Sequence, residues 1–274
     1  MRAFFLQAKA VHRDGFCYTV QMTWANERRL IILGIISLVV LSIFGGTYYL
    51  FAHKAPSCTD GKLNQDETGI DCGGSCTYVC SDTQAPLSVR FVRALSILPG
   101  RTDVVAYIDN PNPKSALRKA PYIIDLYNDQ NLVIAKKSLE VDIPAGGTVP
   151  IFIPNIYSGD EIVARGFLTF DEEALHWFTS DQTHSQVIVK DILFSQQEPP
   201  RITATIENPT AGVLRNVKLI VTVFDASGNA IGASQTIAPR VPAQNSTQVV
   251  FTWPSAFSSP VSRIDIVPLV SLSP

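Results

Sequence analysis

The sequence predicts a mainly β protein with a single N-terminal transmembrane helix, a small disulfide-stapled module and two tandem β-sandwiches. Three observations predict this architecture. One long apolar segment lies near the N-terminus, four cysteines follow directly after it, and short β-branched segments fill the rest of the chain. The pattern of those short segments is repeated once along the chain, which indicates two copies of one domain.

The apolar segment is Leu30–Phe51, which contains no Asp, Glu, Lys or Arg. At about 1.5 Å per residue, a helix of this length reaches roughly 33 Å, and the hydrocarbon core of a bilayer is about 30 Å thick. A buried helix of a soluble protein is the alternative, but such helices rarely run this long without a polar face. We therefore predict a transmembrane helix at 30–51.

Basic residues set the expected orientation of this helix. Residues 1–29 contain five Lys or Arg and two acidic residues, and Arg28 and Arg29 lie directly before the apolar segment. Because Lys and Arg favour the cytoplasmic side, we expect 1–29 to be a cytoplasmic tail and the C-terminal domains to be extracytoplasmic. A cleavable signal peptide would have a shorter apolar region and a small-residue cleavage site. The sequence thus predicts an uncleaved single-pass anchor in the cell membrane, with the lipid bilayer as one partner.

The composition argues against nucleic acid as a partner. The formal net charge is −2 and the pI is about 6.1, so the protein as a whole has no basic field to attract phosphate.

Residues 52–85 form a predicted cysteine-rich module and linker. The four cysteines of this stretch lie close together and are Cys58, Cys72, Cys76 and Cys80. A segment this poor in apolar residues cannot bury a core, so covalent or metal staples must hold it. Two disulfides are the first choice, and three connectivities are open. Zinc is the alternative, but no C-x-x-C pair is present.

The same module contains four side chains with hard oxygen atoms, Asp60, Asn64, Glu67 and Asp71. Calcium prefers such ligands, so calcium is the one cofactor that the sequence suggests. The spacing does not follow the EF-hand pattern. The alternative is that these side chains cap turns of a disulfide-stapled loop, as Asp and Asn often do.

The pattern C-x-D-G-x-x-N-x-x-E-x-G-x-D-C-G-G-x-C over residues 58–76 resembles a short cysteine-rich segment of bacterial cell-surface and secreted proteins. The resemblance implies a surface location, where the segment connects an anchor to adhesive or repeat domains. It implies no activity.

The β-branched segments predict two sandwiches at 86–170 and 184–274, with an interdomain linker at 171–183. Landmarks in the two halves correspond in order: Asn208-Pro lies 98 positions after Asn110-Pro, and Pro242-Ala lies 98 positions after Pro144-Ala. A constant offset across several landmarks indicates a tandem duplication.

Two further landmarks are the segments at 124–128 (Ile-Asp-Leu-Tyr-Asn) and 221–228 (Val-Thr-Val-Phe-Asp-Ala-Ser-Gly). They resemble the F-x-L-Y-D family of small extracytoplasmic immunoglobulin-like sandwiches, which implies an immunoglobulin-like fold without catalytic residues. Tyr127 and Phe224 fall at predicted strand ends, where a ring can close the edge of the sandwich. Asp225 begins a predicted hairpin turn.

No enzyme motif is present: G-x-S-x-G, H-E-x-x-H, a phosphate-binding glycine loop and a dinucleotide fingerprint are all missing. The sequence therefore favours a non-enzymatic binding or scaffold protein of the bacterial cell envelope, with a protein or envelope-polymer partner. An accessory subunit of a secretion, pilus or wall-assembly complex is the alternative. A hydrolase with a site at the domain junction is the third hypothesis.

Overall fold

The computed structural model describes most of the chain, namely residues 24–52, 57–159, 161–182, 185–269 and 272. It divides into two compact units, Met1–Pro56 and Ser57–Pro274. Among the described residues, the first unit contains one long helix and the second contains all the strands.

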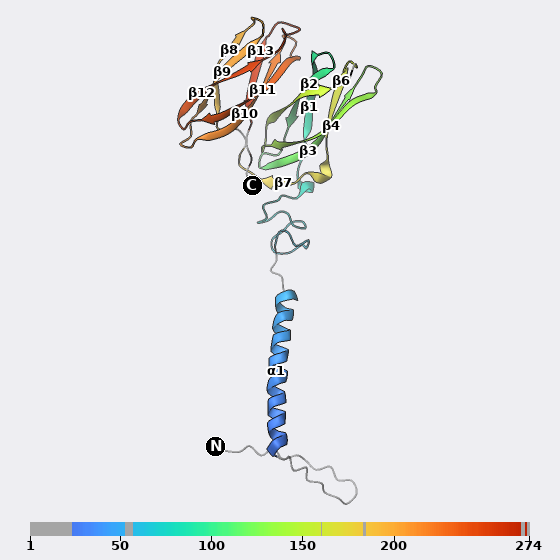
Figure 1. Cartoon of the computed structure of the whole chain (residues 1–274), viewed down its shortest axis with the longest axis vertical. Helices are drawn as coiled ribbons and strands as arrows, with labels where there is room; N and C mark the ends of the chain where they lie inside the picture. Colours follow the sequence, from blue (N-terminus) through green and yellow to red (C-terminus); the bar gives the residue numbers. More distant parts are fainter. Residues whose placement is uncertain (1–23, 53–56, 160, 183–184, 270–271, 273–274) are drawn as a thin grey trace, which may run out of the picture. The chain divides into compact units, whose positions relative to one another are not determined.

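Helix α1 (Trp24–Ala52) contains the predicted transmembrane segment (Figure 1). Its stretch Trp24–Leu50 is long and apolar enough to cross a membrane, and its large apolar side chains are exposed. The helix begins at Trp24 rather than at Leu30, and the Arg28 guanidinium stacks over the Trp24 ring at 3.7 Å. The last part of the predicted tail is therefore helical, while the prediction for 1–23 lies outside the described residues.

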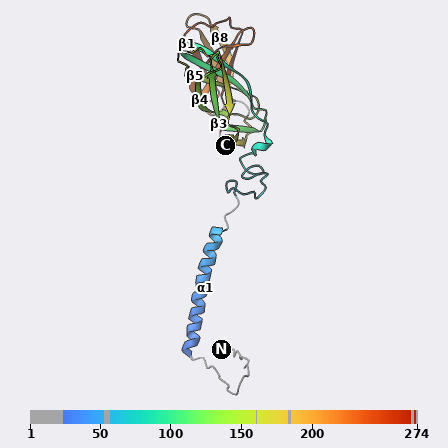
Figure 2. The same cartoon turned by 90° about the vertical axis from the view of Figure 1, so that its right-hand side faces the viewer.

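The first sandwich consists of two antiparallel sheets. One sheet has the strand order β1-β2-β5, and the other has the order β4-β3-β6 with β7 added beside β3. Figure 2 shows β1 and β5 of one sheet together with β3 and β4 of the other. The strands are β1 (Ser88–Leu98), β2 (Arg101–Asp109), β3 (Ser115–Tyr127), β4 (Val133–Ile143), β5 (Thr148–Tyr157), β6 (Arg165–Phe170) and β7 (Trp177–Thr179).

The second sandwich repeats this topology. Its sheets have the orders β12-β9-β8 and β11-β10-β13, so β8 to β13 correspond to β1 to β6 in turn. The strands are β8 (Ile188–Ser195), β9 (Arg201–Asn208), β10 (Leu214–Phe224), β11 (Ala230–Val241), β12 (Asn245–Thr252) and β13 (Arg263–Pro268). The predicted fold class of two tandem immunoglobulin-like sandwiches is confirmed.

The Asn-Pro landmark has the same structural role in both repeats. Asn110, which directly follows β2, is 1% exposed, and Asn208, the last residue of β9, is 0% exposed. The amide of Asn110 donates to the Pro144 C=O at 2.7 Å, and that of Asn208 donates to the Pro242 C=O at 3.1 Å. Each asparagine thus ties the end of its strand to the loop before β5 or β12, which explains why both landmarks share one offset.

The hairpin after β3 and the hairpin after β10 are closed by equivalent side chains. Asn128 Oδ1 accepts from the N–H of Gln130 and Leu132, at 3.1 and 2.9 Å. Asp225 Oδ1 accepts in the same way from the N–H groups two and four residues further on, at 2.9 and 2.8 Å. Asn and Asp supply the same acceptor here, so Asn128 and Asp225 close the same kind of turn.

Replacing Asp225 with Asn is expected to leave the midpoint of denaturation at pH 7 almost unchanged, whereas Asp225→Ala removes the acceptor and lowers the midpoint. Hydrogen bonding to Asn229 lowers the pKa of Asp225 below its ordinary 3.8. The contribution of the ionised carboxylate is therefore present above pH 3.8 and lost as the pH falls through the lower folded pKa. Denaturation of the three proteins between pH 2 and 7 checks this, and equal midpoints for Asp225→Ala and wild type would contradict it.

Each sandwich has its own apolar core. The first is built around residues such as Ile108, Ile124 and Trp177, and the second around residues such as Ile206 and Phe251. One tryptophan belongs to each core: Trp177 is 3% exposed in the first and Trp253 is 6% exposed in the second. The indole N–H of the second donates to the Ala233 C=O at 3.0 Å.

A third apolar cluster joins the two sandwiches. Val105, Tyr107 and Phe152 of the first pack against Ile220 and Phe224 of the second, and Phe224 is 2% exposed. The expectation that Phe224 closes the edge of its own sandwich is therefore corrected. Its ring lies on the outer face of β10 and is buried because the first sandwich covers that face.

The predicted linker 171–183 is also corrected, because it contains β7, which extends a sheet of the first sandwich. Trp177 enters the first core, and Phe178 packs in a small cluster with Ala116 and Leu272. The acidic turn before it is a short 3-10 helix at Glu172–Ala174, without a side-chain cap from Asp171.

Candidate binding groove

The cysteine module is closed by two crossed disulfides. Cys58 is bonded to Cys76 and Cys72 to Cys80, at sequence separations of 18 and 8. This confirms the disulfide-stapled module and selects one of the three connectivities. The Glu67 carboxylate lies beside Cys58 and Cys76, but these two sulfurs are bonded to each other and supply no thiolate for a metal.

The four candidate calcium ligands form hydrogen bonds within the module. The Asp71 carboxylate accepts from the N–H of Asp60 at 2.9 Å and of Gly61 at 2.9 and 3.1 Å. The Asn64 amide donates to both oxygens of Asp60, and its backbone N–H donates to Glu67 at 3.1 Å. A cation would have to compete with these donors for the carboxylate oxygens of Asp60, Glu67 and Asp71, whereas the buried Asn64 Oδ1 accepts no hydrogen bond from the described residues. Calcium binding stays a prediction, and titration of the protein with calcium to the millimolar range tests it.

The module is docked on the first sandwich rather than joined to it by the chain alone. The Val79 N–H donates to the Trp177 C=O at 2.9 Å, and the Thr179 N–H donates to the Thr77 C=O at 3.2 Å. The Asn112 side chain then holds Ala85, accepting from its N–H at 2.9 Å and donating to its C=O at 2.8 Å. Strand β7 therefore lies between the module and β3, and the segment 81–87 is fixed beside it.

Removing the second disulfide by Cys72→Ala with Cys80→Ala is expected to destabilise the module by about 2–3 kcal/mol, because the bond closes a short loop. Trypsin gives a direct measurement, since Lys62 is the only Lys or Arg between residues 57 and 89. If cleavage occurs from an open form, its rate after Lys62 should rise roughly 30–150-fold. Lys62→Gln in the same background is the control that abolishes this cut. An unchanged rate would mean that the first disulfide and the docking on β7 suffice.

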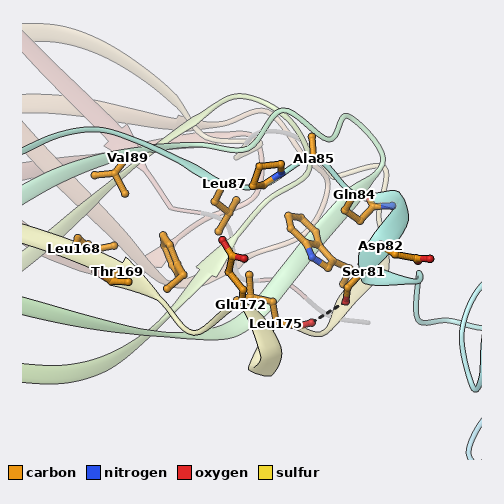
Figure 3. Close-up of a pocket in the computed structure, with 13 residues that line it drawn as sticks. Ser81, Asp82, Gln84, Ala85, Leu87, Val89, Leu168, Thr169, Glu172 and Leu175 are labelled. Carbon is orange, nitrogen blue, oxygen red and sulfur yellow. Dashed lines mark hydrogen bonds between the residues drawn. The ribbon is translucent and has the colours of Figure 1, made fainter.

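A pocket of about 590 Å³ opens beside this junction (Figure 3). Its walls are the fixed segment 81–87, the start of β1, the end of β6 and the chain that leads into β7. Leu168, Leu175 and Trp177 are buried and form an apolar floor, and Asp82 and Glu172 are exposed at the rim. The Ser81 hydroxyl donates to the Leu175 C=O at 3.4 Å, which links the two walls.

A second hollow of about 450 Å³ continues from the first pocket toward the module. The two hollows share Ser81, Leu175 and Trp177, so they are parts of one surface, which we call the module groove. Asp71 and the exposed His176 line the second hollow. Neither hollow has a Lys or Arg in its lining, so the groove combines an apolar floor with carboxylates and no balancing cation.

The groove combines a volume and an apolar lining that are common in ligand-binding sites. Volumes of this size lie within the range of ligand sites, which are mostly apolar with a few polar groups that fix orientation. Among the described residues of the groove, no Ser or Cys nucleophile is paired with a histidine. The ring of His176 lies against Tyr78, with centroids 6.3 Å apart.

The sequence did not reveal this groove. From the sequence alone, we interpret the three acidic residues at 171–173 as a solvated loop and Trp177 as a residue that packs in a domain junction. A weak signal was nonetheless present, because two adjacent large aromatic residues, Trp177 and Phe178, so soon after three acidic residues are unusual for a linker.

The remaining residue singled out from the sequence, Tyr127, lies away from the groove at the end of β3. It is half-buried, and its ring meets that of Phe167 edge-to-face, with centroids 5.5 Å apart. Phe167 is 55% exposed on β6. Tyr127 thus pairs with a neighbouring strand, while its equivalent Phe224 is covered by the other sandwich.

The fold and the groove together define a tandem immunoglobulin-like sandwich protein with a disulfide-stapled module. No protein-family model and no curated protein matches the sequence. Among solved structures, the chain is similar to red sea bream transglutaminase, with 13% sequence identity and a TM-score of 0.25. The match covers 67% of this chain and only 29% of that chain. A likeness this low carries no inference about activity.

Proposed function

We propose that the protein is a single-pass, membrane-anchored binding protein of the bacterial cell envelope, which presents the module groove outside the membrane. In this proposal it has no enzymatic activity. Helix α1 is the anchor, residues before it are cytoplasmic, and Ser57–Pro274 is extracytoplasmic. The resemblance of the cysteine module to bacterial surface segments and of the sandwiches to the F-x-L-Y-D family is part of the same proposal.

The observation that carries the proposal is the fixed position of the module on β7. A connector that only spaced the sandwiches from a membrane would need no backbone hydrogen bonds to Trp177 and Thr179. Their effect is to hold the segment 81–87 against the first sandwich, and this segment is one wall of the groove. Binding sites gain affinity when their walls are ordered before the ligand arrives.

Site-specific photocrosslinking tests the binding function in the native membrane. A photoreactive amino acid at Thr169, which is exposed and lines the groove, should give a defined adduct with protein, glycan or lipid. The same amino acid at the exposed Ser138 on β4 is the matched control. No adduct specific to Thr169 would contradict the proposed function.

Protease added to spheroplasts tests the orientation. Trypsin should degrade the sandwiches and leave a membrane-protected fragment that contains α1. Complete protection of the sandwiches in intact spheroplasts, with degradation after lysis, would place them on the cytoplasmic side instead.

A further inference from the structure

The edges of two different sheets meet at the groove. Strand β1 pairs only with β2, and β6 pairs only with β3, among the described residues. Val89 of β1 and Leu168, Thr169 and Phe170 of β6 line the pocket from its two sides. An unpaired strand edge presents backbone N–H and C=O groups that can pair with another chain.

The register of β6 shows which of its backbone groups are free. The Asp171 N–H donates to the Pro121 C=O at 3.3 Å, which extends the β3–β6 ladder by one pair. Antiparallel pairs alternate between hydrogen-bonded and non-hydrogen-bonded, so the backbone N–H and C=O of Phe170 and Leu168 point away from β3. These are residues of the groove wall, and they offer two donors and two acceptors to an incoming strand.

The charges of the groove select the ligand further. Three carboxylates line the groove, those of Asp82 and Glu172 in the first hollow and that of Asp71 in the second. No Lys or Arg lines either hollow. Asp171 and Glu173, next to Glu172, are also exposed. A basic ligand therefore gains attraction along the rim, while an acidic ligand meets repulsion.

We propose that the module groove binds an extended, basic segment of a partner polypeptide, which adds as a strand to the free edge of β6. Main-chain hydrogen bonds to β6 supply affinity in this mode, and pockets for alternate side chains supply specificity. Apolar side chains of the segment face the floor formed by Leu168, Leu175 and Trp177, and its Lys or Arg side chains reach the carboxylates at the rim. This inference rests on the proposed binding function and names its ligand class.

The experiment uses the full-length protein in nanodiscs of zwitterionic lipid, so that the membrane itself does not attract the probe. The probe is a capped octapeptide of alternating Lys and Val, labelled for fluorescence anisotropy. Its counterpart with Glu in place of Lys should not bind. A version methylated at every backbone nitrogen keeps the side chains and the charge but has no backbone N–H to donate, and it should bind at least 10-fold more weakly.

Variants locate the site. Asp82→Lys and Glu172→Lys should each weaken binding of the Lys-Val peptide about 10-fold or more, while Asp129→Lys, the same charge change in the exposed β3–β4 hairpin, should not. If the methylated peptide binds as tightly as the unmethylated one, strand addition is overturned. Charge attraction is then the remaining explanation for binding. No binding of the Lys-Val peptide would overturn the peptide class.

The two proposals fail in different ways. If crosslinking from Thr169 yields a glycan or lipid while the peptide does not bind, the binding function stands and the peptide inference falls. If crosslinking yields nothing specific, the binding function itself falls.

Discussion

Phe224→Ala is expected to lower the free energy of unfolding of the fragment 57–274 by about 3–5 kcal/mol, the usual cost of removing a buried Phe. The ring is 2% exposed, and it lies edge-to-face with Phe91 and Tyr107 of the first sandwich, at centroid distances of 6.4 and 6.2 Å. The Arg263 guanidinium covers it at 4.0 Å. The loss therefore falls on the contact between sandwiches rather than on either core.

The two tryptophans of the fragment 57–274 make this distinction measurable. Trp177 reports on the first core and Trp253 on the second, and Trp→Phe at either position isolates the other signal. We expect coincident urea transitions in the parent and separate transitions in Phe224→Ala. Phe167→Ala, which removes an exposed ring from β6, is the control and should cost less than about 1.5 kcal/mol. Coincident transitions with a small loss in Phe224→Ala would mean that the sandwiches are not coupled through this ring.

Asn208→Ala is expected to cost about 3–5 kcal/mol, because a fully buried side chain loses five hydrogen bonds worth about 1 kcal/mol each. Its amide donates to the C=O of Gly212, Val241 and Pro242, at 2.7, 3.2 and 3.1 Å. Its Oδ1 accepts from the N–H and the hydroxyl of Thr210, at 3.0 and 2.7 Å. Removal leaves buried carbonyl groups without their donor.

The repeat supplies the matched comparison for this prediction. In the Phe224→Ala background, where we expect the two transitions to separate, Asn110→Ala should shift the Trp177 transition of the first sandwich, whereas Asn208→Ala should shift the Trp253 transition of the second. Asn245→Ala, at an exposed position that starts β12, should change the free energy of unfolding by about 0.5 kcal/mol or less. A loss below 1 kcal/mol for both buried asparagines would show that water replaces their hydrogen bonds.

The parts of this fold that the sequence predicts well are those with a local signal. The length and apolar composition of residues 30–51 are enough to indicate a membrane-spanning helix. The Asn-Pro landmarks keep one offset because each buried asparagine ties the end of its strand to the equivalent loop. The disulfide-bonded cysteines were also predictable. Their pairing was not, since it depends on how the chain crosses itself within the module.

Other features depend on contacts between distant segments. Tyr127 and Phe224 occupy equivalent positions with the same alternation of side chains, but only Phe224 is covered by the other sandwich. The small Ala233 lies opposite Thr222 on that outer face, where the first sandwich has Lys136 opposite Asp125. The groove was hidden for the same reason: its walls come from residues 81–89 and 168–177, which are brought together by the packing of β1 beside β6, by Asn112 and by the docking of the module on β7.

The crossed disulfides also limit how far the protein can be stretched. In the proposed single-pass arrangement, tension between the bilayer and a captured partner is transmitted through residues 58–80. A taut reduced chain of this length would reach roughly 75 Å. With both bonds intact, the shortest covalent path crosses from Cys58 to Cys76 and then follows the chain to Cys80. The Cα–Cα distance across the first bond is 5.7 Å, and the four residues of chain from Cys76 to Cys80 add about 14 Å. The module therefore acts as a tether of fixed reach, about 20 Å, which lengthens only when its environment becomes reducing.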